Sequence, residues 1–209
     1  LGDPVAGLDW VGALLNARGR VLPMALEPLV IQGIVLREHG GAFERVQVRG
    51  QVNLAHEPQV HNIELVPAQA RACPEALASI EEADWVVLGP GSWRTSVLPH
   101  LLLREQREAL STTNAKRCVV MNLALDDKES NGLDASAHLK LLQQYAPNLR
   151  LDVVIADPSN MGVQSEFEDA ARELGAKVLW ASVRSTTNPN VHDPLKLASA
   201  YNDMFAMRL

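Results

Sequence analysis

The sequence predicts an α/β protein with a doubly wound, mostly parallel sheet and a β-rich insertion near the N-terminus. From residue 73 onward, short apolar runs typical of buried strands alternate with helical runs. This alternation implies parallel pairing with right-handed crossovers. Before it, the connections between β-rich segments are too short for crossover helices, which indicates antiparallel pairing. We therefore expect a helix in residues 1–19, a β-rich subdomain in 20–72 and an α/β core in 73–209.

The individual elements follow from hydrophobic spacing and from turn residues. The first helix is predicted because apolar residues recur at helical spacing, namely Leu8, Val11, Leu14 and Leu15. Turn residues such as Gly40, Gly41 and Gly50 separate the β-rich segments. The predicted β-rich segments are Val30–Leu36, Phe43–Val48, Gln51–Leu54 and His61–Val66. In the core, the predicted strands are Trp85–Leu88, Cys118–Leu123, Leu151–Ile155 and Lys177–Ala181, and the predicted helices are Pro74–Glu82, Val97–Leu110, Ala135–Tyr145 and Glu166–Leu174.

Composition excludes several classes of partner. The 19 basic and 25 acidic residues give a net charge of -6, and no run of Lys or Arg could follow a phosphate backbone, so we expect no nucleic-acid partner. No apolar stretch reaches the roughly 20 residues of a membrane span, and no signal pattern opens the chain, so we expect no membrane partner. Cys73 and Cys118 lack disulfide or metal spacing, which indicates free thiols and a cytoplasmic protein.

A glycine-rich loop follows the predicted strand that ends at Leu88. Glycines let backbone N–H groups approach a ligand, and the N-terminus of the following helix favours an anion, so we expect phosphate here. A tight turn with a Ser or Thr cap fits the same residues equally well. The loop lacks the Walker A ending and the GxGxxG spacing, which disfavours an ATPase. The candidate ligand-binding residues of this loop are Gly89, Pro90, Gly91, Ser92, Thr95 and Ser96.

The loops that follow the parallel strands should share one rim, where ligands bind in such sheets. Asn122 ends the second core strand and is a candidate ligand contact. The acidic residues Asp126, Asp127 and Glu129 follow it, and their oxygens suit Mg²⁺ held together with substrate phosphates. Spacing alone favours a solvated acidic loop without an ion.

Other polar residues near this rim have structural alternatives. Asp157 is a turn former or a rim contact, and we leave it unassigned. Asp193 is predicted to cap the last helix, beside the candidate ligand contact His192. Trp93 either stacks on a base or sugar or covers the core, and His138 is expected to pack rather than act as an acid or base. No Ser/His/Asp order or nucleophilic cysteine signature supports a hydrolase.

Four segments together resemble the CofD-like (2-phospho-L-lactate transferase-like) family. They are Arg18–Pro23, Ala83–His100, Asn122-Leu123 and His192–Leu197, and their order spans nearly the whole chain. The resemblance implies a Rossmann-like domain, to which residues 1–19 and 73–209 would belong. The family's glycine-rich nucleotide loop and early acidic segment precede this region, so the chain looks like a fragment that lacks the N-terminal part.

Within this family the chain resembles the bacterial gluconeogenesis-factor branch, which implies a nucleotide or UDP-sugar binding regulator of cell shape and envelope growth. The alternative is a Mg-dependent transferase that passes a phospholactyl group from a guanosine diphosphate carrier to a deazaflavin. Two differences from the family's sequence pattern weaken the transfer of its function to this chain. Residues Ala124–Ser130 replace the common Met-Thr-Gln-Pro-Gly-Glu-Thr pattern, and Val191 stands where some members have an arginine. A scaffold with an empty crevice is a third interpretation. An unpaired strand edge would favour a homo-oligomer.

Overall fold

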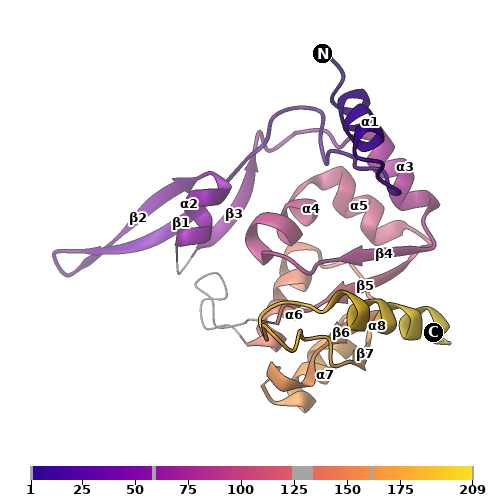
Figure 1. Cartoon of the computed structure of the whole chain (residues 1–209). Coiled ribbons are helices and arrows are strands. Elements are labelled where there is room, and N and C mark those ends of the chain that lie inside the picture. Colours follow the sequence, from indigo (N-terminus) through magenta and orange to yellow (C-terminus); the bar gives the residue numbers. More distant parts are fainter. Residues whose placement is uncertain (1, 58–59, 124–133, 161, 209) are drawn as a thin grey trace.

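The computed structural model describes residues 2–57, 60–123, 134–160 and 162–208, and they form two separate sheets flanked by helices (Figure 1). A three-stranded antiparallel sheet extends to one side of the view, and a four-stranded parallel sheet forms the centre of the molecule. The α/β fold expected from the sequence is confirmed. The strands are β1 (Val30–His39), β2 (Ala42–Arg49), β3 (His61–Val66), β4 (Trp85–Leu88), β5 (Lys116–Val120), β6 (Val153–Ala156) and β7 (Lys177–Trp180). The α-helices are α1 (Pro4–Leu14), α2 (Gln51–His56), α3 (Pro74–Glu82), α4 (Leu98–Leu102), α5 (Arg104–Thr112), α6 (Ala135–Tyr145), α7 (Gln164–Glu173) and α8 (Pro194–Ala206).

The antiparallel sheet has the strand order β2-β1-β3. Gly40 and Gly41 both have positive φ angles, and they close the hairpin between β1 and β2. The prediction of a strand at Gln51–Leu54 is wrong, because these residues begin α2. Gly50, at a φ of 89°, turns the chain out of β2, and one short helix then buries Leu54 completely. An alternation of polar and apolar residues over only four positions cannot distinguish a short helix from a strand.

The parallel sheet has the order β4-β5-β6-β7, with each strand paired in parallel to the next. Alternate residues of a strand face opposite sides of the sheet. Accordingly, Val119 and Val154 belong to the core that includes residues of α4, α6 and α7, whereas Cys118 and Ile155 belong to the core with α8. Helices therefore cover both faces, and the carboxyl ends of all four strands lie along one edge of the sheet.

The helix predicted over Val97–Leu110 is divided into two helices and preceded by a third helical turn. Trp93–Val97 is a π-helical turn, α4 follows, and α5 begins after an extended residue, Leu103. Within one continuous helix, residues two positions apart point in nearly opposite directions. The break at Leu103 lets both Leu101 and Leu103 be buried, which explains why the continuous-helix prediction is wrong.

Helix α1 (Pro4–Leu14) lies within the range 1–19 in which the sequence predicts a helix, and it leaves most of its apolar residues uncovered. The Asp3 carboxylate caps it by accepting hydrogen bonds from the backbone N–H groups of Val5 and Ala6. Val5 is buried, whereas Trp10 and Leu14 are exposed, the latter at 83%. In the part of the chain that the structure describes, no helix has the length and apolar character needed to cross a bilayer.

Candidate functional site

The loops after β4 and β5 meet the segment before α8 around an open pocket of about 430 Å³. Asn122 joins two of these loops. Its side-chain oxygen accepts a hydrogen bond from the Gly91 N–H at 3.0 Å, and its side-chain nitrogen donates to the Gly91 carbonyl at 2.8 Å. This pair of bonds holds the glycine-rich loop against the end of β5. The pocket is lined by Pro90, Gly91, Asn122, Leu123, Asn190, Val191 and His192.

Gly89 allows the glycine-rich loop to cross closely over the end of β5. Its φ angle is +80°, and a Cβ atom placed there would lie 2.9 Å from the Val120 carbonyl oxygen. Gly91 is less constrained, because a Cβ atom there would lie at an ordinary 3.4 Å from the Ser96 Cβ. The Gly91 N–H is engaged by Asn122 in this structure, so its hydrogen-bonding capacity is directed to the protein.

Ser92 and Thr95 form a helix cap. The Ser92 hydroxyl oxygen accepts hydrogen bonds from the Thr95 backbone N–H at 3.1 Å and from the Thr95 hydroxyl at 2.7 Å. This is the capped turn that the sequence offered as an alternative to phosphate binding. Neither residue is among those that line the open pocket.

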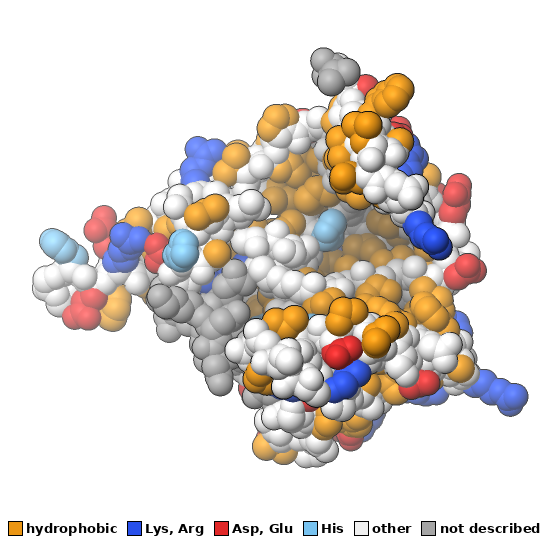
Figure 2. Space-filling view, viewed as in Figure 1, with side chains coloured by type: hydrophobic (Ala, Val, Ile, Leu, Met, Phe, Trp, Pro, Cys, Tyr) orange, Lys and Arg blue, Asp and Glu red, His pale blue; other side chains and the backbone are white. Residues whose placement is uncertain are grey.

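Gly89 and Ser96 line a different cavity, of about 300 Å³. Its walls come from the segment after α1 and from α3, β4 and α5, and they are mainly apolar, with a hydrogen bond of 2.9 Å between His100 and Gln106 as a polar contact. Figure 2 shows this face as a hollow with hydrophobic side chains, beneath the apolar surface of α1. The structure therefore divides the eight candidate residues: Pro90, Gly91, Asn122 and His192 share the open pocket, Gly89 and Ser96 line the second cavity, and Ser92 and Thr95 form the cap.

His192 is the ionisable residue among those that line the open pocket. Its Nε2 atom is buried and has no hydrogen-bond partner. Burial lowers the pKa of His192 below its ordinary value of 6.5, and a hydrogen bond to the backbone of Met121 offsets only part of this effect. A neutral imidazole carries one donor and one acceptor nitrogen, so the buried Nε2 lacks the partner that either role requires.

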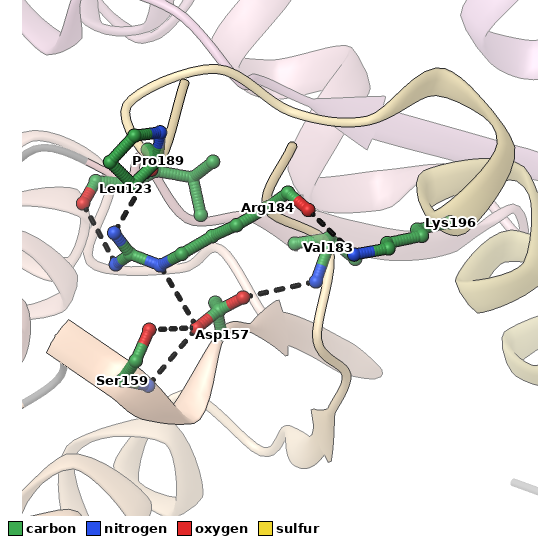
Figure 3. A network of polar contacts seen from close by, with 7 residues as sticks. All are labelled: Leu123, Asp157, Ser159, Val183, Arg184, Pro189 and Lys196. Carbon is green, nitrogen blue, oxygen red and sulfur yellow. Dashed lines mark hydrogen bonds and ion pairs between the residues drawn. The ribbon is translucent and has the colours of Figure 1, made fainter. Parts of the chain in front are cut away.

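Beside the pocket, an ion pair between Asp157 and Arg184 joins the loops after β6 and β7, and Arg184 also donates a hydrogen bond to Leu123 in the loop after β5 (Figure 3). Asp157 follows β6 and is 2% exposed, and Arg184 follows β7. Burial opposes ionisation of Asp157, but hydrogen bonds from Ser159, Arg184 and the Val183 N–H together outweigh it and lower its pKa. The sequence left Asp157 unassigned and gave no signal for Arg184, because the contacts of Arg184 join distant segments.

Trp93 and His138 both pack in the protein interior. Trp93 is buried, and its ring centroid lies 5.2 Å from that of His138, which is also buried. His138 Nδ1 lies 2.9 Å from the Asp134 carbonyl oxygen. Trp93 therefore belongs to the core, and its ring is not available for stacking on a base or a sugar.

Comparison with known proteins identifies the family. The family profile described as 2-phospho-L-lactate transferase CofD matches residues 1–184. The chain belongs to the CofD family. It is 38% identical over 210 residues to a Mycobacterium tuberculosis protein named "Putative gluconeogenesis factor", covering 99% of this chain and 61% of that protein. A Mycobacterium leprae protein of the same name is 39% identical over 204 residues, covering 96% and 56% respectively.

The CofD-family chain thus spans less than two thirds of the length of these curated relatives. A "Gluconeogenesis factor" from Halalkalibacterium halodurans is 30% identical over 145 residues, which is 69% of this chain and 43% of that protein. Among solved structures, a member of the UPF0052 family from Bacillus halodurans superimposes with a TM-score of 0.78 at 24% identity, covering 95% of this chain and 67% of that one. This likeness shows a shared fold.

The position where some CofD-like proteins carry an arginine is Val191 in this chain. Val191 is half exposed and lines the open pocket. No Lys or Arg is found among the described residues that line this pocket. Any positive charge that a diphosphate needs must therefore come from outside this set of residues.

Neither a cluster of metal ligands nor an exposed thiol occurs among the described residues of this CofD-family chain. Across residues 2–57, 60–123, 134–160 and 162–208, no three His, Cys, Asp or Glu side chains gather to hold a metal ion. The predicted acidic cluster of Asp126, Asp127 and Glu129 lies outside the described residues, as does Ala124–Ser130. Cys73 and Cys118 are free and buried, and burial raises the pKa of Cys118 to about 12, which keeps it a thiol.

Proposed function

We propose that this chain carries the ligand pocket of a gluconeogenesis-factor-type regulator, which binds a nucleotide or a UDP-sugar and thereby controls cell shape and envelope growth. The observation that carries this proposal is the convergence of Gly91, Asn122 and His192 on one open pocket at the carboxyl ends of β4 and β5. Ligands of open α/β sheets bind at this edge. The curated relatives are named gluconeogenesis factors, which supports the gluconeogenesis-factor part of the proposal.

The chemistry of the pocket suits the uncharged portion of such a ligand. Its volume of about 430 Å³ lies within the roughly 300–1,000 Å³ typical of small-molecule sites. An amide oxygen has two lone pairs and an amide nitrogen has two N–H groups, so Asn122 retains hydrogen-bonding capacity after it has bound Gly91. These remaining amide groups suit a sugar hydroxyl or a base edge.

The competing function is a Mg-dependent 2-phospho-L-lactate transferase-like enzyme with a deazaflavin acceptor. The description of the matching family profile favours it. The described lining of the pocket offers no carboxylate for Mg²⁺ and one ionisable side chain, His192. A single histidine is a sparse set of groups for phosphoryl-group chemistry, and we therefore favour binding. A scaffold with an occluded crevice is disfavoured, because Gly91 borders an open pocket.

Calorimetric titration of the protein tests the proposal. The ligands are UDP, UDP-N-acetylglucosamine and GDP, each with and without Mg²⁺. We expect binding of a uridine ligand that weakens tenfold or more in Asn122→Ala and in Gly91→Val. The matched controls are Asn202→Ala on the exposed surface of α8 and Gly19→Val, where an added Cβ meets no atom within 4 Å.

The possible outcomes separate the candidate functions. Loss of uridine binding in the two pocket variants and not in the controls would support the regulator. A preference for GDP with dependence on Mg²⁺, followed by turnover with a deazaflavin acceptor, would favour the transferase. Absence of binding by all three nucleotides would reject a nucleotide site on this chain.

A further inference from the structure

The segment from Arg184 to Asp193 forms one wall of the open pocket, through Asn190, Val191 and His192. Backbone hydrogen bonds close this segment into a compact loop. The Ser185 N–H donates to the Val191 carbonyl at 2.9 Å, and the Asp193 N–H donates to the Val183 carbonyl at 2.8 Å. Arg184 and His192 form an isolated antiparallel bridge at the base of the loop. The wall that carries His192 is therefore built directly on Arg184.

The Arg184 side chain connects this wall to the rest of the rim, and each of its three nitrogens contacts a different segment (Figure 3). Nη1 donates to the Pro189 carbonyl at 3.0 Å, within the loop itself. Nη2 donates to the Leu123 carbonyl at 3.1 Å, in the loop after β5. Nε donates to the Asp157 carboxylate at 3.1 Å, after β6.

Asp157 is held in place to receive this guanidinium. Its Oδ2 accepts a hydrogen bond from the Val183 N–H at 3.0 Å, and its Oδ1 accepts hydrogen bonds from the Ser159 N–H at 3.0 Å and from the Ser159 hydroxyl. On the other side, Lys196 donates to the Arg184 carbonyl at 2.9 Å, so the arginine backbone is anchored to α8 as well. A buried charge is costly unless it is paired and hydrogen-bonded, and both conditions are met here.

We propose that Arg184 is a positioning residue that sets the distance between the two walls of the ligand pocket, and thereby places His192 opposite Asn122. This inference rests on the proposed function, because the pocket is the proposed nucleotide site. The planar guanidinium offers donors in fixed directions to three segments at once, whereas the single ammonium group of a lysine does not. Arg184→Lys therefore keeps the charge but releases at least one wall.

The alternative is that the Arg184–Asp157 pair contributes to stability alone. A matched control exists at the opposite end of the same sheet, where Arg117 of β5 pairs with Asp152, the residue before β6, at 3.8 Å. Arg117 is as little exposed as Arg184, at 16% against 20%, and it also donates to backbone carbonyls, those of Leu110 and Ser111. The Arg117 pair is longer than that of Arg184, and Asp152 is 29% exposed against 2% for Asp157, but Arg117→Lys removes the guanidinium of an equally buried arginine remote from the pocket.

The test compares R184K, R117K and the unaltered protein by two measurements. The first is calorimetric affinity for UDP-N-acetylglucosamine, at a temperature where circular dichroism shows all three proteins folded. The second is hydrogen exchange of the Ser185 and Asp193 amides without ligand. We expect R184K to bind about tenfold more weakly and to exchange these two amides about tenfold faster, while R117K stays within twofold of the unaltered protein in both measurements.

Several outcomes would overturn the inference. If R184K binds within twofold of the unaltered protein, or if R117K weakens binding equally, Arg184 does not position the pocket. If the unaltered protein binds no nucleotide, the proposed function fails, and the exchange data decide the positioning role by themselves. Unchanged amide exchange in R184K then rejects the positioning role of Arg184, and faster exchange in R184K but not in R117K supports this role.

Discussion

At the scale of single residues, Gly89 and Asn122 together determine where the glycine-rich loop lies. The positive φ of Gly89 turns the chain sharply at the end of β4, and the missing side chain lets the loop approach the Val120 carbonyl. Only after this close approach can Asn122, two residues beyond β5, reach both backbone groups of Gly91. The geometry of the pocket therefore depends on a residue that is not part of its lining.

Replacing Gly89 with alanine tests this dependence. The backbone conformation alone should cost about 1–3 kcal/mol in a residue with a side chain. The overlap of the new Cβ with the Val120 carbonyl should add roughly 1–3 kcal/mol. The matched control is Gly50→Ala, because Gly50 also has a positive φ, of 89°, but an added Cβ there meets nothing within 4 Å. Urea unfolding should show the larger loss of free energy in Gly89→Ala, and equal losses would contradict the overlap argument.

His192 should be neutral at neutral pH. Burial lowers its pKa in the folded protein below the ordinary value of 6.5. The unfolded chain therefore binds a proton at a higher pH than the folded one, so this residue's contribution to stability is complete above about pH 6.5 and declines as the pH falls toward the folded pKa. An NMR titration of the His192 ring should give a midpoint below that of the urea-unfolded chain. A midpoint at or above the unfolded one would contradict burial as the controlling factor.

At the scale of elements, Arg94 connects the glycine-rich loop to the antiparallel sheet. It lies in the π-helical turn after this loop, and its side chain is buried. Its guanidinium donates to the Glu57 carbonyl at 2.6 Å and to the Leu54 carbonyl at 3.4 Å, at the end of α2. Cations are favourable at the C-terminal end of a helix, where backbone carbonyls lack partners.

Arg94→Met should therefore destabilise the protein by about 2–3 kcal/mol, because buried carbonyls lose a charged donor. Its matched control is Arg37→Met. Arg37 pairs at 2.6 Å with the side chain of the same residue, Glu57, but is 57% exposed, and exposed pairs contribute about 0–1 kcal/mol. Urea unfolding measures both changes, and hydrogen exchange of the α2 amides should increase in Arg94→Met alone. Similar losses in the two variants would show that the linkage through Arg94 is weak.

Helices and strands are found with their predicted bounds where local sequence determines the structure. The predictions are wrong where packing against distant residues determines it. The strand runs Trp85–Leu88 and His61–Val66 are found with the predicted bounds, because apolar and β-branched residues are bounded by turn residues. Leu103 breaks the predicted helix so that a second leucine can be buried, which depends on neighbours that local sequence does not reveal. The role of Arg184 cannot be predicted from local sequence either, because its contact with Leu123 joins residues 61 positions apart.

At the scale of the whole molecule, β4 lies at one edge of the parallel sheet. In the described part of the chain it pairs with β5 alone. Val87 of this edge strand is partly exposed, and it lines the 300 Å³ apolar cavity that Figure 2 shows beneath α1. The apolar residues Trp10 and Leu14 of α1 are also exposed. An unpaired strand edge and an adjacent apolar surface together form a template for association.

We expect this edge to bind a second copy of the chain, and light scattering coupled to size-exclusion chromatography tests this. Over a range of concentrations, the unaltered protein should show a mass above that of the monomer. Val87→Lys and Leu14→Lys should each weaken association tenfold or more, because a charge would be buried against the edge strand or against α1. The matched control is Leu195→Lys on α8, where Leu195 is 82% exposed and does not line the apolar cavity. A monomer at all concentrations would exclude self-association, and equal weakening by Leu195→Lys would show that association does not depend on the β4 edge and α1.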